Sequence, residues 1–366
     1  MPSEHQTYQA RVYGLKARER EILRLVVKSF INTAGPVGSR FLSRHFPIGL
    51  SPASIRNTMS VLEERGYLDH PYTSAGRVPT ELGYRAFVDE LMEASQLSEE
   101  ERTHLGGQLD VQWEDTDQLL REGSRLLGQL TNLLGVVLSP RLSTGVLERL
   151  EVVPLSSSRV MFVLSVRGGL IRTIVLHLDS ELGREDLTRV VSMLNERLAG
   201  LTLEEIRQTC VPRMQDLRDD ATGIIQLVLS ASGLLFSEPA VGHRVQVAGT
   251  PNIIAQPEFQ EPDDLRSLIA LLEDQDTVVH LLEEPPLVNE PEVGRAYVRI
   301  GSENENPHVG REQAQRFSIV TAQYARGGTR GTIGVIGPTR MDYERVVALV
   351  EGIAALISWP REDAPN

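Results

Sequence analysis

Cysteine is almost absent from this chain, and long apolar runs are absent altogether. A single cysteine, Cys210, stands in 366 residues, so an intramolecular disulfide framework is excluded. Apolar runs never reach the roughly 18 residues that a transmembrane helix needs, and the opening MPSEHQTYQAR lacks the apolar core of a secretion signal. These absences lead us to expect a protein of the reducing cytoplasm with no membrane partner.

The signatures of catalysis and of metal binding are missing as well. The glycine-rich stretch Gly327–Gly337 is not followed by Lys-Ser/Thr, so it is no phosphate-binding loop, and we expect a hairpin and a tightly packed strand. Ser156–Ser158 lies outside any G-x-S-x-G pattern. The histidines form no ligand spacing with Cys210. We therefore expect no catalytic residues, no metal and no cofactor.

Positive charge is scarce overall but concentrated at one end. The formal net charge is -13, whereas residues 1–88 hold 12 basic and 7 acidic side chains, a net charge of +5, so the remainder carries -18. A basic segment on an acidic chain is typical of a protein that brings one part to nucleic acid while the rest is repelled by it. The distribution therefore predicts an N-terminal DNA-binding head.

The order of local patterns in this basic segment predicts a winged helix-turn-helix between about Leu15 and Met92. Apolar residues recur at helical spacing, and Gly-Pro pairs and isolated glycines separate the elements. The expected elements are a helix over 15–32, a short helix after Gly38, a helix over 51–65, a strand over 67–70, a turn over 71–76, a return at 77–79 and a helix from Thr80.

The third of these helices has the composition of a recognition helix. Ser51 as N-cap and Pro52 in the first turn are a strong start signal. Ile55, Met59 and Leu62 share one apolar face, which leaves small and polar residues on the other. The predicted DNA contacts on the helices are Arg40, Ser51, Ala53, Ser54, Arg56, Asn57 and Ser60, and those of the wing are Thr73, Ser74, Gly76 and Arg77.

Each of these contacts has a chemical reason and an alternative. Arg56 can donate to guanine or to phosphate, and Asn57 can pair with adenine in the major groove. Arg77 suits a narrow minor groove or a phosphate. The alternatives are that Arg56 is a solvated surface residue and that Arg77 pairs with a nearby carboxylate.

The remainder of the chain predicts an α+β fold. An acidic stretch to about residue 117 is interpreted as a partly helical linker, and a leucine-rich helix is expected over 118–134. Strands are expected over 135–139, 147–154, 160–166 and 170–178, followed by a mostly helical segment to about residue 236. Strand patterns then return over 244–247, 294–300, 318–325 and 331–336, with helices over 263–272 and 343–357.

Several stretches resemble the HrcA family of heat-inducible transcription repressors. In the N-terminal part these are PVGSRFLS, LSPASIRNTMSVLEERGYL and TSAGRVPTELGYRAFVDEL. In the C-terminal part they are GTPNII (Gly249–Ile254), VRIGSEN (Val298–Asn304) and GVIGPTRMDYERV (Gly334–Val346). The resemblance covers nearly the whole chain in order. Two positions depart from the family pattern, because Tyr72 replaces the usual histidine and Thr58 an acidic residue.

The resemblance implies a domain organisation and a function. Residues 1–93 would be the winged helix-turn-helix, 94–117 a linker, 118–179 and 240–366 the two parts of a GAF-like domain, and 180–239 an inserted, mainly helical dimerisation segment. The family represses chaperone operons by binding an inverted-repeat operator, called CIRCE, as a homodimer. Its activity depends on a GroEL-type chaperonin.

Two questions stay open at this point. The apolar residues of 187–198 can form either a dimer face or the core of the insertion: Leu187, Val190, Val191, Leu194 and Leu198. Besides a dimeric repressor controlled by protein folding, the chain fits a regulator whose GAF-like domain binds a small ligand, or an enzyme with an accessory DNA-binding head. A ligand that changes operator affinity would favour the ligand-binding regulator, and turnover of a substrate would favour the enzyme.

Overall fold

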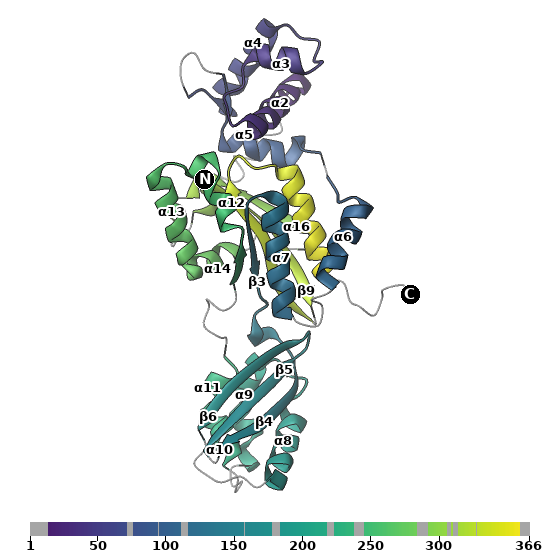
Figure 1. Cartoon of the computed structure of the whole chain (residues 1–366), viewed down its shortest axis with the longest axis vertical. Coiled ribbons are helices and arrows are strands. Elements are labelled where there is room, and N and C mark those ends of the chain that lie inside the picture. Colours follow the sequence, from purple (N-terminus) through teal and green to yellow (C-terminus); the bar gives the residue numbers. More distant parts are fainter. Residues whose placement is uncertain are drawn as a thin grey trace.

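The computed structural model arranges the chain as three parts along one long axis (Figure 1). It describes residues 14–71, 76–93, 95–110, 116–156, 158–177, 184–217, 223–237, 245–283, 292–305, 309, 314–326 and 328–358. We call residues 14–93 the head, residues 142–237 the distal part, and the remaining described residues between them the body. Head and distal part lie at opposite ends of the molecule. The protein combines helices and sheets, as an α+β fold requires.

The head contains helices and a two-stranded sheet in the predicted order. Its elements are α2 (Ala17–Thr33), α3 (Ser39–His45), α4 (Pro52–Glu64), β1 (Leu68–Asp69), β2 (Val78–Pro79), α5 (Glu81–Ala86) and the π-helical turn η1 (Phe87–Leu91). The apolar face predicted for α4 is buried, since Ile55, Met59 and Leu62 are at most 3% exposed. They pack with the apolar stripe of α2 in one core.

Close approach of α5 to β1 depends on a glycine. A Cβ atom at Gly83 would lie 2.2 Å from the backbone oxygen of Tyr67. We expect Gly83→Ala to lower the free energy of unfolding by about 1–3 kcal/mol, because backbone atoms must separate to admit the methyl group. Calorimetry would measure the change. Gly107→Ala, in an exposed position with no atom nearby, is the control and is expected to stabilise by up to about 1 kcal/mol. Equal effects of the two substitutions would contradict the packing argument.

The body is built on a five-stranded antiparallel sheet of order β7-β3-β10-β9-β8. The strands are β3 (Leu134–Leu138), β7 (Val245–Ala248), β8 (Ala296–Ile300), β9 (Phe317–Arg326) and β10 (Thr329–Pro338). The glycine-rich stretch thus lies in the β9–β10 hairpin, as expected from the sequence.

Helices cover both faces of this sheet. One face carries α7 (Thr116–Thr131) and α16 (Tyr343–Ser358), and the other α12 (Thr250–Ile254), α13 (Pro262–Glu273) and α14 (Gln275–Glu283). Strand alternation separates two cores, since Val335 joins the α7–α16 side and Ile336 the α13–α14 side. The predicted linker contains α6 (Glu99–Asp110), whose Leu105 and Leu109 are buried in the first of these cores.

The distal part corrects the boundary predicted for the insertion. Strands β4 (Leu147–Ser156), β5 (Arg159–Val166) and β6 (Leu170–His177) form a separate antiparallel sheet. Their inward residues share a core with the helices α8 (Arg184–Leu198), α9 (Leu203–Arg213), α10 (Ile224–Ser230) and α11 (Ser232–Leu235). The inserted unit therefore begins near residue 142 rather than 180, and it is a sheet with helices rather than a mainly helical segment. The predicted boundary was wrong because a hairpin pattern in the sequence indicates that two strands are neighbours but not which sheet those strands belong to.

The end of the segment predicted to be mostly helical up to residue 236 contains η3 (Gln215–Leu217) and the short helices α10 and α11 in its described part. Leu187, Val190, Leu194 and Leu198 are at most 8% exposed and lie in the distal core, so they do not form a dimer face. Arg340, shortly before α16, forms an ion pair with Glu258. Among the described residues no helix is long and apolar enough to cross a membrane.

Candidate nucleic-acid interface

The start of α4 is held by its own serines. The Ser51 side chain accepts a hydrogen bond from the Ser54 backbone N–H at 3.2 Å, and the two hydroxyls lie 3.2 Å apart. Ser51 and Ser54 were predicted to contact phosphate or water, and the structure shows them engaged in capping the helix. Such caps stabilise a helix by about 1 kcal/mol. Thr58, which departs from the family pattern, is buried and donates to the Ser54 carbonyl at 3.1 Å.

The predicted reading face of α4 is open to solvent. Ala53, Arg56 and Asn57 are exposed, whereas Ser60 is half-buried. Arg56 forms no ion pair among the described residues. Its guanidinium is therefore free to meet a base or a phosphate, as is that of Arg40, which is exposed on α3.

Two further exposed arginines of the head, Arg18 and Arg44, were not predicted from the sequence. Arg18 is exposed on α2 and donates to the Ser54 carbonyl at 3.0 Å, which places its guanidinium beside the first turn of α4. Arg44 is exposed on α3 and, in the described part of the chain, has no carboxylate partner. Helical periodicity would have placed Arg40 and Arg44 one turn apart, but the nearness of Arg18 to α4 is visible only in three dimensions.

The wing is described only at its base. Thr73 and Ser74 lie outside the described residues, as does Tyr72, while Gly76 is half-buried. Arg77 pairs through its backbone with Val37, with both hydrogen bonds 2.9 Å long.

The side chain of Arg77 pairs with a carboxylate, which was the alternative to DNA contact considered for it from the sequence. Its Nε and Nη2 atoms lie 2.8 and 2.6 Å from Oε2 of Glu63, near the end of α4. The other carboxylate oxygen of Glu63 contacts Nδ1 of His70. A phosphate would have to displace Glu63 to reach Arg77.

Glu63, Asp69 and His70 bring three potential metal-ligand atoms within 4.8 Å of one another. Glu63 is already neutralised by the guanidinium of Arg77, so a cation would meet a positive charge beside it. The group fits an ion-pair network that holds the wing base better than it fits a metal site, and we assign it no metal.

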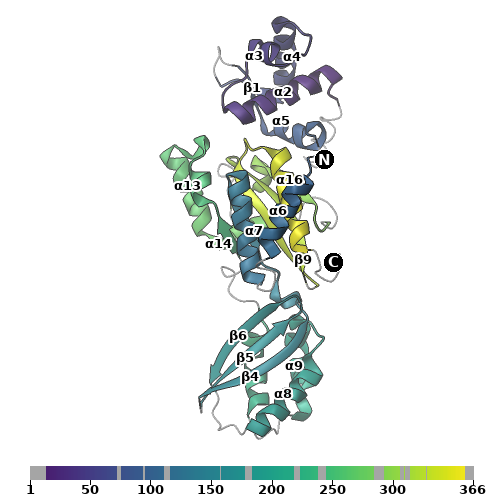
Figure 2. The ribbon, with the colours of Figure 1, turned by 45° about the vertical axis from the view of Figure 1, so that its right-hand side comes forward.

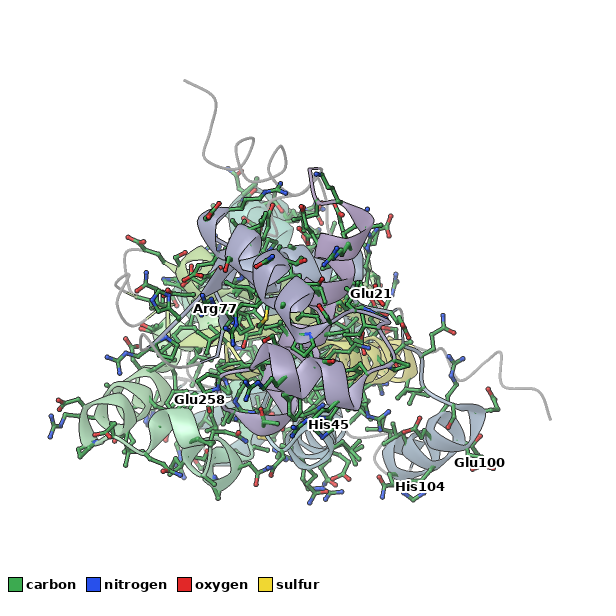
Figure 3. All side chains as sticks on the ribbon, turned by 90° about the horizontal axis from the view of Figure 1, so that it is seen from above. Glu21, His45, Arg77, Glu100, His104 and Glu258 are labelled. Carbon is green, nitrogen blue, oxygen red and sulfur yellow. The ribbon has the colours of Figure 1, made fainter. Side chains whose placement is uncertain are left out.

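Five other basic side chains of the head are paired with acids of the head or the body. Arg20 pairs with Glu90, Arg24 with Glu93, Lys28 with Glu344, Arg65 with Glu19, and Arg85 with Glu303. Four exposed arginines have no carboxylate partner among the described residues: Arg18, Arg40, Arg44 and Arg56. They lie on α2, α3 and α4, the elements uppermost in the view down on the head (Figure 3). Lys16, the N-cap of α2, is likewise exposed and has no ion pair in the described part of the chain. We call the region of α2, α3 and α4 that carries the four arginines the arginine surface.

Similarity to known proteins extends over nearly the whole chain. Residues 117–347 match the family model described as the HrcA protein C-terminal domain. The heat-inducible transcription repressors HrcA of Chlorobium phaeobacteroides and Prosthecochloris aestuarii are 40% and 39% identical to this chain. Those alignments cover 94% and 95% of this chain and 98% of each relative. A crystal structure described as a hypothetical protein shares the fold, with a TM-score of 0.58 at 23% identity over 94% of this chain and 98% of that one.

Proposed function

This chain belongs to the HrcA family of heat-inducible transcription repressors, and on that premise we propose that it represses chaperone operons as a homodimer bound to an inverted-repeat, CIRCE-type operator. The observation that carries the proposal is the arginine surface, where four exposed guanidiniums without a carboxylate partner among the described residues lie on α2, α3 and α4. Charge that no carboxylate neutralises attracts phosphate, and the polar face of a helix can read bases in the major groove.

The head acts in this proposal as a winged helix-turn-helix. Its support is the order of three helices, a two-stranded sheet and a further helix, with α3 and α4 packed together and the wing joining β1 to β2. α4 is the recognition helix, with Arg56 and Asn57 reading bases. Ala53 permits close approach, Ser60 and Arg40 flank the helix, and Thr73, Ser74 and Gly76 form the wing. The N-terminus of α4, at Ser51 and Ser54, suits a phosphate.

A second copy of the chain is proposed to bind the outer face of the β4–β6 sheet. Helices cover only one face of this sheet, as Figure 2 shows. On the other face Val153, Met161 and Val175 lie side by side in register across the three strands. Ile171 and Val175 on β6 are 69% and 48% exposed. An apolar centre of this kind is typical of a subunit interface.

The position of this face suits two-fold reading of DNA. A symmetric dimer uses the same patch on both subunits and matches a palindromic site. Because the distal part lies at the end opposite the head, contact between two such faces leaves both heads uncovered. A two-fold axis alongside the long axis of the molecule then places both heads at one end.

The body is proposed to be GAF-like, supported by its single antiparallel sheet with helices on both faces. Dependence on a GroEL-type chaperonin rests on the family relationship. In the proposed mechanism, chaperonin occupied by misfolded protein no longer helps the repressor to reach its active form, and the operons are expressed.

A gel-shift titration tests the proposed function. The full chain would be titrated against the inverted repeat upstream of a chaperone operon of its own genome and against a scrambled duplex, with and without chaperonin. We expect preferential binding to the inverted repeat that strengthens with chaperonin. Equal, weak and salt-sensitive binding to both duplexes would refute the operator proposal, and operator binding indifferent to chaperonin would refute only the proposed control.

Arg44 and Arg77 are expected to differ in the salt dependence of operator binding. Arg44→Ala should lower the slope of log affinity against log salt by about one, because one phosphate contact is lost. Arg77→Ala should leave the slope unchanged, because Glu63 already compensates its charge. Fluorescence anisotropy over a range of salt concentrations measures both slopes. A drop of about one for Arg77→Ala would show that Arg77 leaves Glu63 for the DNA backbone.

A further inference from the structure

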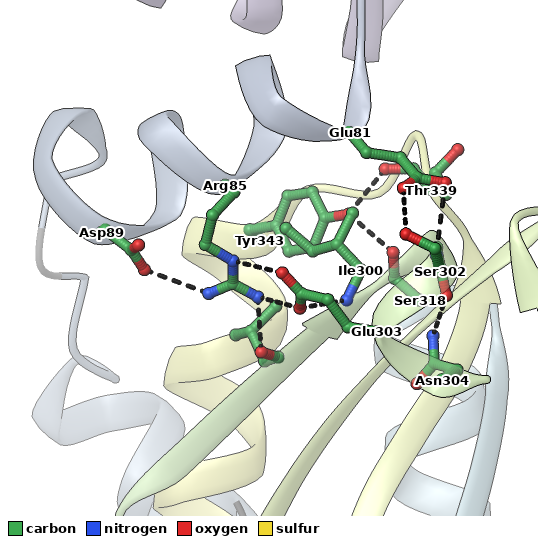
Figure 4. A network of polar contacts seen from close by, with 12 residues as sticks. Glu81, Arg85, Asp89, Ile300, Ser302, Glu303, Asn304, Ser318, Thr339 and Tyr343 are labelled. Atoms are coloured by element: carbon green, nitrogen blue, oxygen red, sulfur yellow. Dashed lines mark hydrogen bonds and ion pairs between the residues drawn. The ribbon is translucent and has the colours of Figure 1, made fainter. Parts of the chain in front are cut away.

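Three of the stretches that carry the family resemblance meet where the head joins the body. They are the α5 segment of the head, the VRIGSEN stretch at the end of β8, and the GPTRMDY stretch that leads into α16. These stretches belong neither to the arginine surface nor to the β4–β6 sheet proposed as the dimer contact. Figure 4 shows their side chains joined in one polar network, which we call the junction.

The centre of the junction is the bidentate ion pair between Arg85 of α5 and Glu303. Nε and Nη2 of Arg85 donate to the two carboxylate oxygens of Glu303 at 2.9 and 2.6 Å. Nη2 also donates to the Val298 carbonyl at 2.7 Å, and Nη1 to Asp89 at 3.0 Å. Burial lowers the pKa of Arg85, but the charges and hydrogen bonds of Glu303 and Asp89 outweigh it and raise the pKa above its usual value. A planar guanidinium with all three of its nitrogens hydrogen-bonded fixes the orientation of α5 as well as its distance from the body.

A second contact lies one helical turn before Arg85. The carboxylate of Glu81 accepts hydrogen bonds from the backbone N–H of Ser302 at 3.2 Å and from its hydroxyl at 2.5 Å. Gly301 makes this approach possible: its φ is +52°, and a Cβ atom there would lie 2.2 Å from Oε1 of Glu81. The turn that carries Ser302 is itself held by Asn304, whose Nδ2 donates to the carbonyls of Gly301 and Phe317 at 3.1 and 3.0 Å.

A third contact reaches the far end of α2. Nη1 of Arg340 donates to the Ile31 carbonyl at 2.8 Å, while Glu258 of the body holds the same guanidinium. Lys28 of α2 adds an ion pair of 3.0 Å with Glu344. The head is thus tied to the body at both α5 and α2, so that it cannot turn about a single hinge.

Apolar packing continues through the same region. Tyr84 of α5 and Tyr343 of α16 have ring centroids 5.9 Å apart, and both rings are buried. The Tyr343 hydroxyl donates to the Thr339 carbonyl at 2.7 Å and lies 2.9 Å from the Ser318 hydroxyl. Head and body share one hydrophobic core, in contrast to two domains joined by a tether.

We infer that Arg85, Glu303, Glu81, Ser302 and Arg340 are positioning residues that set the distance between operator half-sites to which the dimer binds. The inference rests on the proposed function. In a two-fold dimer joined through the distal sheets, the body transmits the geometry of the dimer contact to each head. A rigid junction then gives the second head a high effective concentration at a half-site that lies at one distance from the first. Half-sites at other distances are not reached. None of these side chains touches DNA in this scheme.

The test varies the spacer between two half-sites. Full-length wild type and Arg85→Ala would be titrated against duplexes with the native spacer, with about five base pairs added (half a turn) and with a single half-site. For the wild type we expect affinity to fall at least about 100-fold on the half-turn duplex, towards the half-site value. For Arg85→Ala we expect about tenfold weaker binding on the native spacer, an unchanged half-site affinity, and only a few-fold difference between spacers.

Controls separate orientation from folding. Arg197→Ala removes a bidentate pair with Asp216 in the distal part and should keep the wild-type spacer profile. Arg85→Lys retains the positive charge but cannot form the bidentate pair of a guanidinium. Its dependence of affinity on spacer length should therefore lie between those of wild type and Arg85→Ala. Ser302→Ala removes only one donor to Glu81 and decides the question if Arg85→Ala fails to fold, since it too should flatten the profile.

The outcomes distinguish the two proposals. A wild-type chain that binds operator and scrambled DNA alike refutes the proposed function and this inference with it. A sharp wild-type spacer profile that Arg85→Ala and Ser302→Ala both retain overturns the inference alone. Loss of half-site affinity in step with operator affinity also overturns it, because the junction would then serve only the fold of the head.

Discussion

The Val175→Asp variant is expected to bind the operator with an affinity about 100-fold or more below that of the wild type. Val175 lies on the edge strand β6, on the outer face of the β4–β6 sheet, next to Met161 of the central strand in register. An aspartate there is solvated in a monomer but must be desolvated in a face-to-face dimer, where the symmetry brings both copies of the charge to one interface. Without the dimer each head binds alone, and the gain of about 10²–10⁴ from two linked heads disappears.

The Val175→Asp experiment has two readouts and a matched control. Sedimentation velocity should show a monomer, and titration of operator and single half-site duplexes should give similar affinities. Val211 on α9 is equally exposed, at 48%, but lies on the helical side of the distal part. Val211→Asp should remain dimeric and bind operator as the wild type does. A dimeric Val175→Asp would place the subunit contact on another surface.

Replacing Arg56 by alanine is expected to weaken operator binding about 10- to 100-fold and to relax specificity at one base pair. Arg56 is exposed on the reading face of α4 and has no ion pair among the described residues. A bidentate contact of arginine with guanine discriminates between bases by about 1–3 kcal/mol. Because the side chain makes no intramolecular ion pair there, the free energy of unfolding should change by less than about 0.5 kcal/mol.

Competition among operator variants measures this effect. Each base pair of a half-site would be changed in turn, and wild type compared with Arg56→Ala. We expect the variant to lose discrimination at a single position. Arg44→Ala is the control, because loss of a phosphate contact should weaken all duplexes alike. A uniform loss for Arg56→Ala would reassign Arg56 to the DNA backbone.

Local signals predicted the elements of the head well. Ser51 and Pro52 marked the start of α4, and the spacing of Ile55, Met59 and Leu62 gave its buried face correctly. Each signal acts over a few residues through capping or helical periodicity, so it can be evaluated without knowing the fold. The same holds for the strands of the body, whose limits lie within two residues of the predicted ones.

The partners of side chains in the candidate site could not be predicted from such local signals. Arg56 and Arg77 are the same residue type in the same basic segment, but one is unpaired and the other is bound by Glu63. The difference arises because the return strand of the wing passes beside the end of α4. Sequence reasoning left both possibilities open for Arg77, and it missed Arg18, whose position depends on the packing of α2 against α4.

The sequence by itself determined where helices and strands form, which faces are apolar and where positive charge is concentrated, because these depend on neighbouring residues. Only the tertiary structure decided that β4–β6 leave the body sheet to form one unit with α8–α11, and that Arg85, Glu303 and Arg340 fasten the head. Arg85 and Glu303 are 218 residues apart. No local pattern specifies such a pair, since it is chosen by the packing of elements whose own formation does not require it.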